Sequence, residues 1–416
     1  MTVSEEDWET AVVPKTQVGL VLGIWLSGVF AASLGGRFES GKDGITSMVL
    51  LGAAVVWPIL YFALSRCRFV PRSLPFGATI AVALFALVST LSSFLSPVTF
   101  LSTGYVVLTL AGIWLALQFN SNLDADQYER GLKVFAVIMT GLVLGFTCYD
   151  YVPGKRLGMG KELLNPNTIA LVACSALLAT MAIRTVLVRL LFMVPLTAVI
   201  FLTSSRTSAC AAAIGLVIIL LFRFRTAKAG IAMVAVLCLV VAVGATAIYG
   251  DVLYGFLDRF FALSAADRGF GSGATGRITA WKTTWDLFLR HPVLGVGFRA
   301  HEHILKVDTS AHNGYLATLA EVGIIGFLAV MYLVLRGLRL LWASIKNPSH
   351  VFTYSILFGL CVGYLLLAVF ERYLINVGNP TSLLFLLSVI RPGIMEHRAP
   401  QEDDLLLGSL EESAVG

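Results

Sequence analysis

Residues 351–370 read VFTYSILFGLCVGYLLLAVF, twenty residues in a row without a charged side chain. About 20 apolar residues form a helix that is long enough to cross the hydrocarbon core of a bilayer. Eleven further stretches of this kind occur, at approximately 16–34, 45–65, 76–95, 98–119, 131–149, 167–183, 186–203, 207–222, 230–249, 313–335 and 379–392. The pattern predicts an all-α polytopic integral membrane protein with about 12 transmembrane helices.

The composition of the whole chain agrees with this class. Of its 416 residues, 57% are hydrophobic and 13% are charged, whereas a soluble domain carries about 25% charged residues. The net charge of +5 is modest, and no basic run with interleaved aromatic residues occurs outside the loops, so we expect contact with membrane lipids and not with nucleic acid. The six cysteines form no CxxC or Cys/His cluster, which argues against a zinc site.

The basic residues predict which way the helices face. Twelve helices place both ends of the chain on one side of the membrane. If that side is the cytoplasm, the inward loops carry sixteen Lys and Arg residues and the short outward loops carry seven, as the enrichment of basic residues in cytoplasmic loops requires. The chain then divides into about nine helices in 1–249, a partly helical periplasmic loop at 250–312, about three helices in 313–395, and a polar cytoplasmic tail at 396–416.

The loop at 250–312 is the longest polar interruption of the apolar pattern. Between residues 277 and 290, apolar side chains recur at helical spacing, namely Ile278, Trp281, Trp285 and Phe288. This predicts a helix that lies along the outer membrane surface. The side chains of the loop that are candidates for contact with a polar substrate are Arg277, Trp281, Arg290, His301 and His303.

His312 stands at the end of this loop, directly before Asn313 and the next apolar segment. A histidine at a helix start is commonly a cap or an interfacial residue, but a neutral imidazole can also accept the proton of a hydroxyl group at neutral pH. Glu321 lies half a turn out of phase with His312 at about 100° per residue. We therefore expect Glu321 to take part in packing, beside Gly323 and Gly326, and not to orient that histidine.

Other basic residues lie on the outward side against the charge bias. Lys155 and Arg156 precede Asn165-Pro166-Asn167, and Arg206 lies between two closely spaced apolar segments. An arginine at membrane depth costs about 2.5 kcal/mol or more unless it snorkels to the surface or binds an anion. The hydroxyl side chains on both sides of Arg206 favour anion binding, because the first N–H groups of a helix bind phosphates.

In their order along the chain, these residues resemble the O-antigen ligase and polymerase superfamily. The motifs that carry the resemblance are Asn165-Pro166-Asn167, Ser204-Ser205-Arg206, Gly276-Arg277-x-x-x-Trp281, Pro292-x-x-Gly295-x-Gly297, His312-Asn313-x-x-Leu316 and Glu321-x-Gly323-x-x-Gly326. They cover approximately residues 160–335. The predicted helices and the large outward loop before the last three of them fit the same layout.

The resemblance implies a GT-C-like membrane glycosyltransferase of the bacterial inner membrane, with a periplasmic active site and without a metal, cofactor or nucleotide. In the ligase branch the donor would be a glycan linked to undecaprenyl pyrophosphate, the acceptor would be lipid A–core, and the product would be lipopolysaccharide. By motif position, the essential residues of the family fall on Arg206, Arg277 and His312. The arginines would hold the pyrophosphate, and His312 would accept the proton of the acceptor hydroxyl.

Further residues are expected to contact the substrates around these three. They are Arg290, Lys155, Arg156, Asn165, Asn167, Trp281, Asn313, His301 and His303.

Three other interpretations remain open. An O-antigen or exopolysaccharide polymerase, or a protein O-oligosaccharyltransferase, would share all of the motifs. A transporter of lipid-linked glycans would be expected to show an internal repeat and charges near the middle of the bilayer; no convincing repeat is evident, and the outward charges cluster at one face. A loop that only binds partner proteins through its tryptophans would leave Arg206 without a role.

Overall fold

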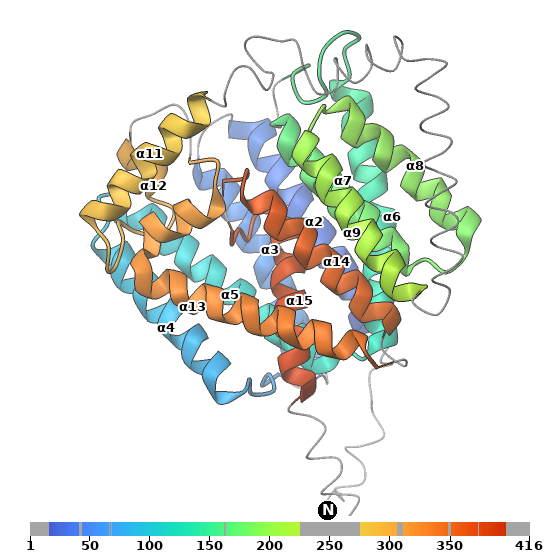
Figure 1. The fold of residues 1–416 in the computed structure, drawn as a ribbon, viewed down its shortest axis with the longest axis horizontal. Helices are drawn as coiled ribbons and strands as arrows, with labels where there is room; N and C mark the ends of the chain where they lie inside the picture. Colours follow the sequence, from blue (N-terminus) through green and yellow to red (C-terminus); the bar gives the residue numbers. More distant parts are fainter. Residues whose placement is uncertain are drawn as a thin grey trace, which may run out of the picture.

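The computed structural model describes residues 16–40, 44–65, 67, 69–161, 164–224, 275–305, 311–347, 351–372 and 374–396. Over these residues the chain is helical and contains no strand. The helices are α2 (Thr16–Ser40), α3 (Gly44–Leu64), α4 (Phe76–Phe94), α5 (Thr99–Asn122), α6 (Ala125–Asp150), α7 (Pro166–Ala179), α8 (Val186–Leu202), α9 (Arg206–Arg223), α11 (Thr275–Arg290), α12 (His301–Leu305), α13 (Gly314–Ile345), α14 (Val351–Ala368) and α15 (Pro380–Glu396), as Figure 1 shows.

Eleven of the predicted apolar segments coincide with these helices, and the segment at 230–249 lies outside the described residues. Seven described helices are long and apolar enough to cross a membrane, and four shorter ones are also apolar. The number of twelve spans and the periplasmic placement of the loop remain predictions. Helix α6 begins six residues before the predicted segment, because Asp124 and Gln127 form a capping box in which each side chain bonds the backbone N–H of the other.

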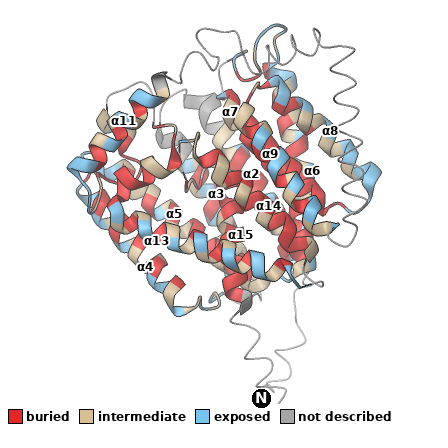
Figure 2. Ribbon diagram, in the orientation of Figure 1, coloured by how far each residue is buried: buried red, intermediate tan, exposed pale blue. Residues whose placement is uncertain are grey.

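Helix α7 lies at the centre of the bundle, where Figure 2 shows mostly buried residues. Every residue from 169 to 182 is buried, and α7 contacts α6, α8, α9, α14 and α15. A helix that is apolar on all sides is expected in such a position. Its neighbours therefore determine where its first residues, Asn165 to Asn167, are held.

Helices α9 and α14 pack antiparallel through glycines. Gly215 lies against Gly359, and an added Cβ at Gly359 would be 2.8 Å from the carbonyl oxygen of Gly215; one turn along, Gly363 lies against Ala211. Small residues let two helices approach this closely inside a membrane. Continued by one more turn, the register places Arg206 level with the end of α14.

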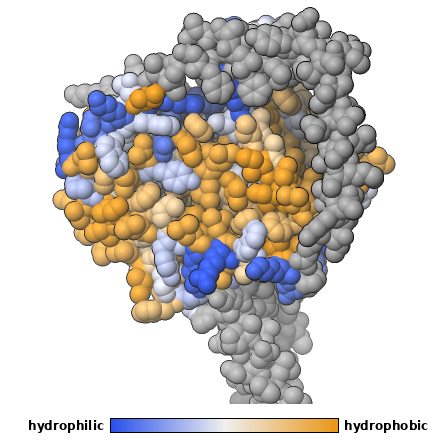
Figure 3. Space-filling model, in the orientation of Figure 1, coloured by the Kyte–Doolittle hydropathy of each residue, from blue (hydrophilic) through white to orange (hydrophobic). Residues whose placement is uncertain are grey.

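The bundle has two polar ends. Helices α7, α9, α13 and α15 begin at one end, called here the His312 face, and α6, α8 and α14 begin at the other, the Glu129 face. On the Glu129 face, the Glu129 carboxylate lies 3.3 Å from Arg184 and 3.9 Å from Lys133, and it accepts a hydrogen bond from Thr353. Figure 3 shows a broad band of hydrophobic side chains between hydrophilic ones near the two ends. The apolar helices and this band describe a multi-pass membrane protein.

The helix predicted within the loop is present as α11, and it ends at Arg290 as predicted. It packs against α13 through Ala280, Thr284, Leu287 and Phe288, while Ile278 and Trp285 stay exposed. The apolar side chains recognised in the sequence are thus divided between the protein interior and the outer surface of the helix.

Candidate functional site

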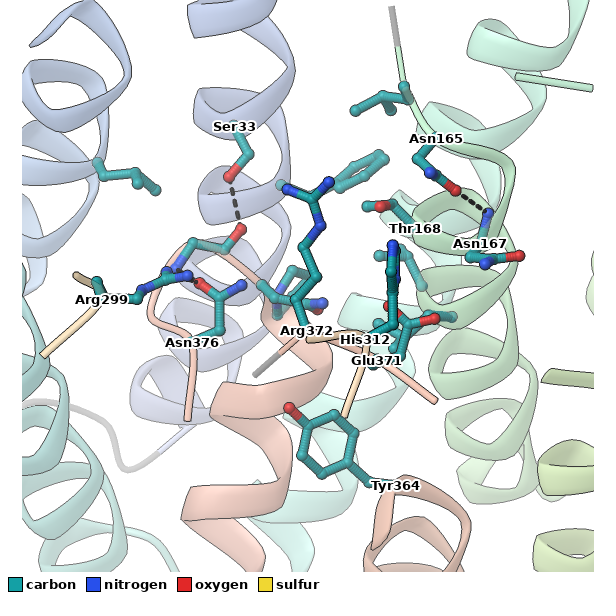
Figure 4. A pocket seen from close by; sticks show the side chains of 18 of the residues that line it. Ser33, Asn165, Asn167, Thr168, Arg299, His312, Tyr364, Glu371, Arg372 and Asn376 are labelled. Carbon is teal, nitrogen blue, oxygen red and sulfur yellow. Dashed lines mark hydrogen bonds between the residues drawn. The ribbon is translucent and has the colours of Figure 1, made fainter. Parts of the chain in front are cut away.

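A cavity of about 310 Å³ opens on the His312 face. Segments that are far apart in the sequence form its wall, from α2 to the start of α15. Its polar lining consists of Ser33, Tyr105, Asn165, Asn167, Thr168, Arg299, Glu302, His312, Tyr364, Glu371, Arg372, Asn376 and Asn379. Figure 4 shows Arg372, His312 and Glu371 between the start of α7 on one side and Arg299 with Asn376 on the other.

Three helices begin at this cavity. Asn165 caps α7 and Asn379 caps α15, each with its side-chain oxygen accepting from the backbone N–H two residues later at 2.9 Å and each followed by a proline. Asn313 caps α13 by accepting from the N–H groups of Tyr315 and Leu316. Proline at the first helical position and asparagine before it are favourable for helix initiation. The partial positive charges of three helix N-termini therefore meet at one place and favour an anion there.

Two arginines add full positive charges to this wall. Arg299 is buried, donates to the Asn376 side-chain oxygen at 2.7 Å, and stacks over the Tyr105 ring with its guanidinium carbon 4.6 Å from the ring centre. Arg372 lies 3.7 Å from the Glu302 carboxylate. Planar guanidinium groups suit phosphate oxygens.

His312 is half-buried in the cavity, with a left-handed backbone (φ 43°) that is rare for a residue other than glycine. Burial, together with the positive charges of Arg372 and Arg277 and against the opposing effect of Glu302, lowers the pKa of its imidazole to about 4. The ring is therefore neutral at physiological pH. Because the charge of Arg277 acts on this pKa, the loop arginine and His312 lie within electrostatic reach of each other.

A half-buried glutamate, with one carboxylate oxygen buried, completes the cavity. Glu371 follows α14, and burial raises its pKa to about 7, against the charges of Arg277 and Arg372, which lower it. A carboxyl group in this range exists in both protonation states near neutral pH. The cavity thus holds one neutral imidazole and one titratable carboxyl group next to the same two arginines.

The two glycine motifs of the sequence are partners in one structural contact. The segment 292–297 lies along a break in α13 at Gly323 (φ 63°), with bonds from Val296 N to Ala320 O (3.0 Å), from Gly297 N to Glu321 O (3.1 Å) and from Ile324 N to Pro292 O (2.8 Å). A Cβ added at Gly295 would lie 2.3 Å from the Glu321 backbone. Glycine is required because the two backbones touch.

This contact also gives Glu321 its partner. Its carboxylate oxygen Oε1 lies 2.6 Å from Nδ1 of His301, and both side chains are buried. Glu321 therefore does not orient His312, as predicted from the helical phase, and it belongs to the packing of α13. His301, which was expected to bind substrate, lies inside this contact and not in the cavity wall, while its neighbours Arg299 and Glu302 do line the cavity.

The other predicted residues lie around the cavity at different distances. His312, Asn165 and Asn167 line it; Arg277 and Trp281 lie against Phe370, next to Glu371. Arg206 begins α9, level with the end of α14. Arg156 donates to the Thr203 carbonyl at 2.7 Å, beside the exposed Lys155, and Arg290 and His303 are exposed on α11 and α12. Of these predicted residues, His312, Asn165 and Asn167 line the cavity, and the others, Arg206 and Arg277 included, lie outside its lining.

Several residues of the cavity wall were not predicted from the sequence. They are Arg299, Glu302, Glu371, Arg372, Asn376 and Asn379. One signal was available, because Asn379-Pro380 repeats the Asn165-Pro166 pattern at the start of an apolar segment. Of the rest, Glu302 lies in the five-residue helix α12 and the others lie in short connections, with no pattern of their own.

A comparison with known families supports the resemblance seen in the motifs. Residues 191–331 match the family model described as O-antigen ligase. The match supports a relation to the O-antigen ligase and polymerase superfamily over this segment of the chain. The matched segment carries Arg206, Arg277 and His312, whereas Asn165, Glu371 and Arg372 lie outside it. No curated protein matches the chain. The superfamily consists of membrane glycosyltransferase-like ligases and polymerases, which act on lipid-linked glycans.

Proposed function

We propose that this protein is an O-antigen ligase, which transfers a glycan from undecaprenyl pyrophosphate to a sugar hydroxyl of lipid A–core. The observation that supports this most directly is the cavity itself, where three helix starts and the arginines Arg299 and Arg372 surround a neutral His312. Such a site binds a diphosphate and leaves a proton acceptor next to it.

The reaction follows from these charges. The acceptor oxygen attacks the anomeric carbon, the bond between that carbon and the phosphate oxygen breaks, and a single displacement inverts the centre. Negative charge grows on the lipid pyrophosphate, where Arg372, Arg277 and Arg206 stabilise it without a metal ion. His312 takes up the proton of the hydroxyl. Fixed donors aimed at a developing charge are commonly the largest catalytic contribution, on the order of 3 kcal/mol each.

Donor and acceptor would both reach the cavity from the membrane. Both proposed substrates are lipids, and the cavity opens on the end of the bundle that the charge bias assigns to the periplasm. The basic side chains Arg184 and Lys133 gather on the opposite face around Glu129, which supports the same orientation. We therefore place the reaction at the periplasmic surface of the bacterial inner membrane.

Reconstitution tests this function. Purified protein in liposomes, given lipid-linked glycan and lipid A–core without nucleotide and in the presence of a chelator, should form the conjugate and release undecaprenyl pyrophosphate. Arg277→Ala should lower kcat/KM on the order of 10²-fold and His312→Ala between about 10² and 10⁴-fold. Loss of activity on chelation, or full activity of both variants, would contradict the proposed roles.

A polymerase remains the second candidate, because it would use the same donor chemistry with a second lipid-linked repeat as acceptor. The same assay separates the two. Long chains formed from lipid-linked repeats alone would assign the protein to the polymerases, and transfer to a peptide would assign it to the protein O-oligosaccharyltransferases.

A further inference from the structure

Glu371 has one side-chain oxygen that nothing in the described part of the chain satisfies. Its Oε1 is buried and has no hydrogen-bond partner there, although the residue lines the cavity. Oε1 of Glu302 in the same wall has none either, but the other carboxylate oxygen of Glu302 lies 3.7 Å from Arg372. Buried polar atoms are nearly always bonded, so an unsatisfied carboxylate oxygen that faces a cavity indicates a group that arrives with the substrate. A hydroxyl group or a proton would satisfy it.

The charged groups around Glu371 leave this oxygen available. Arg277 approaches from α11 and Arg372 follows it in the chain, yet among the described residues neither forms an ion pair with it within 4.0 Å. His312 before α13, and Glu302 of α12, line the same cavity, and Tyr364 of α14 lies in the wall below. The carboxyl group of Glu371 is therefore not taken up by either arginine, and it lines the cavity together with Arg372.

The two titratable groups differ in how firmly they hold a proton. Burial and the arginines lower the pKa of His312 to about 4, whereas burial raises the pKa of Glu371 to about 7. A proton on the imidazole is thus held weakly, and its transfer to the carboxylate across the shared cavity is favourable. The hydroxyl proton of Tyr364 is held in a hydrogen bond to the Leu374 carbonyl at 3.0 Å.

We propose that Glu371 is the second proton acceptor of the transfer: the proton that the acceptor hydroxyl loses passes through His312 to the free carboxylate oxygen of Glu371. This inference rests on the proposed function and deepens it. The hydroxyl O–H bond breaks as its oxygen bonds the anomeric carbon, the electron pair of the broken glycosyl bond stays on the pyrophosphate, and the proton ends on Glu371 as a carboxylic acid. The carboxylate is regenerated when this proton passes to water after product release.

The pH dependence of transfer tests this role. In the reconstituted protein, kcat/KM of the wild type should fall on the acid side as the Glu371 carboxylate becomes protonated, with a midpoint near pH 7. Glu371→Gln should remove this acid limb and lower the rate at pH 8 on the order of 10²-fold. Glu371→Asp should restore the limb with a shifted midpoint, because it keeps a carboxyl group.

Two comparisons separate a proton-handling role from charge or structure. Glu302→Gln removes a carboxylate from the same wall and should keep the acid limb. Binding of farnesyl pyrophosphate, which carries no sugar, should change less than threefold in Glu371→Gln. A Glu371→Gln protein that keeps the acid limb and a rate within twofold of wild type, or that loses pyrophosphate binding as strongly as transfer, would overturn the inference alone. A wild-type protein without any transfer would overturn the proposed function together with it.

Discussion

His301 and Glu321 form a buried contact of 2.6 Å between the ring nitrogen Nδ1 and the carboxylate oxygen Oε1. The contact joins α12 to α13 at the point where Gly323 breaks the helix. It holds the short segment from which Arg299 and Glu302 reach the cavity. A pair outside the cavity wall thus determines where two of the groups that line the cavity lie.

Removal of one partner of this pair should destabilise the protein. Glu321→Ala leaves the buried His301 ring without its carboxylate, and the loss of one member of a buried pair costs on the order of 3 kcal/mol. The midpoint of thermal unfolding in detergent should fall accordingly. A double variant with His301→Ala should lose less than the two single losses added together; strictly additive losses would show that the contact does not stabilise the fold.

The close backbone contact around Gly323 should tolerate no side chain. Gly295→Ala has a positive φ of 73° and would bring a Cβ within 2.3 Å of the Glu321 backbone. We expect a loss of about 2–4 kcal/mol and a lower yield of folded protein, measured by thermal unfolding and size-exclusion profile. Gly141→Ala is the matched control, because nothing lies within 4 Å of an added Cβ there; in the middle of α6 it should be neutral or stabilise by roughly 0.5–1 kcal/mol.

The capping role of the Asn379 side-chain oxygen at the start of α15 can be tested separately from the NH2 group of its amide. Asn379→Ser keeps an oxygen that accepts from the Thr381 N–H, whereas Asn379→Ala leaves that group unpaired at the cavity. The alanine variant should lose about 1 kcal/mol of stability, and the serine variant should remain close to wild type. Thermal unfolding of the two variants checks this, and equal losses would mean that the cap contributes nothing.

Arg372 should contribute to pyrophosphate binding more than its exposure suggests. Arg372→Gln removes a charge-assisted contact worth roughly 1.5–3 kcal/mol, so farnesyl pyrophosphate should bind about 10–100-fold more weakly, as measured by calorimetry in detergent. Lys282→Gln, an exposed residue of α11 outside the cavity wall, serves as the control for lost positive charge. Equal weakening in both variants would point to a general electrostatic attraction and not to a site.

The stability of the protein should depend on pH through two groups of opposite sign. Between pH 4.5 and about 7, folded Glu371 keeps a proton that the unfolded chain has lost, so this group stabilises less as the pH rises. Between about pH 4 and 6.5, the unfolded chain binds a proton at His312 that the folded protein does not, so that contribution grows as the pH rises.

Glu371→Gln isolates the first of these effects. Relative to wild type it should gain stability as the pH rises from 5 to 8, up to roughly 3 kcal/mol, because one pKa unit corresponds to about 1.4 kcal/mol. Thermal unfolding in detergent at several pH values measures the difference. Parallel curves for the two proteins would contradict the raised pKa of Glu371.

The helical segments and several helix ends of this protein can be predicted from the sequence, because interactions between neighbouring residues determine them. The segment 351–370 is long and apolar enough to form a membrane helix on its own. The end of α11 at Arg290 is predicted by the proline that follows at position 292. The order of the motifs along the chain was also enough to show the resemblance to one family, and Arg206, Arg277 and His312 lie within the segment that matches its model. These features require no knowledge of which helix packs against which.

The tertiary structure alone decided the composition of the cavity. Arg299, Glu371 and Asn379 come from connections with no periodicity, and they meet His312 only because α7, α13 and α15 begin at the same place. Burial reverses the ordinary order of the two pKa values, because it lowers that of the His312 imidazole and raises that of the Glu371 carboxyl group. The pairing of His301 with Glu321 likewise follows from the packing of α12 against α13, since the two residues lie in different helices and a phase of about 100° per residue does not relate them.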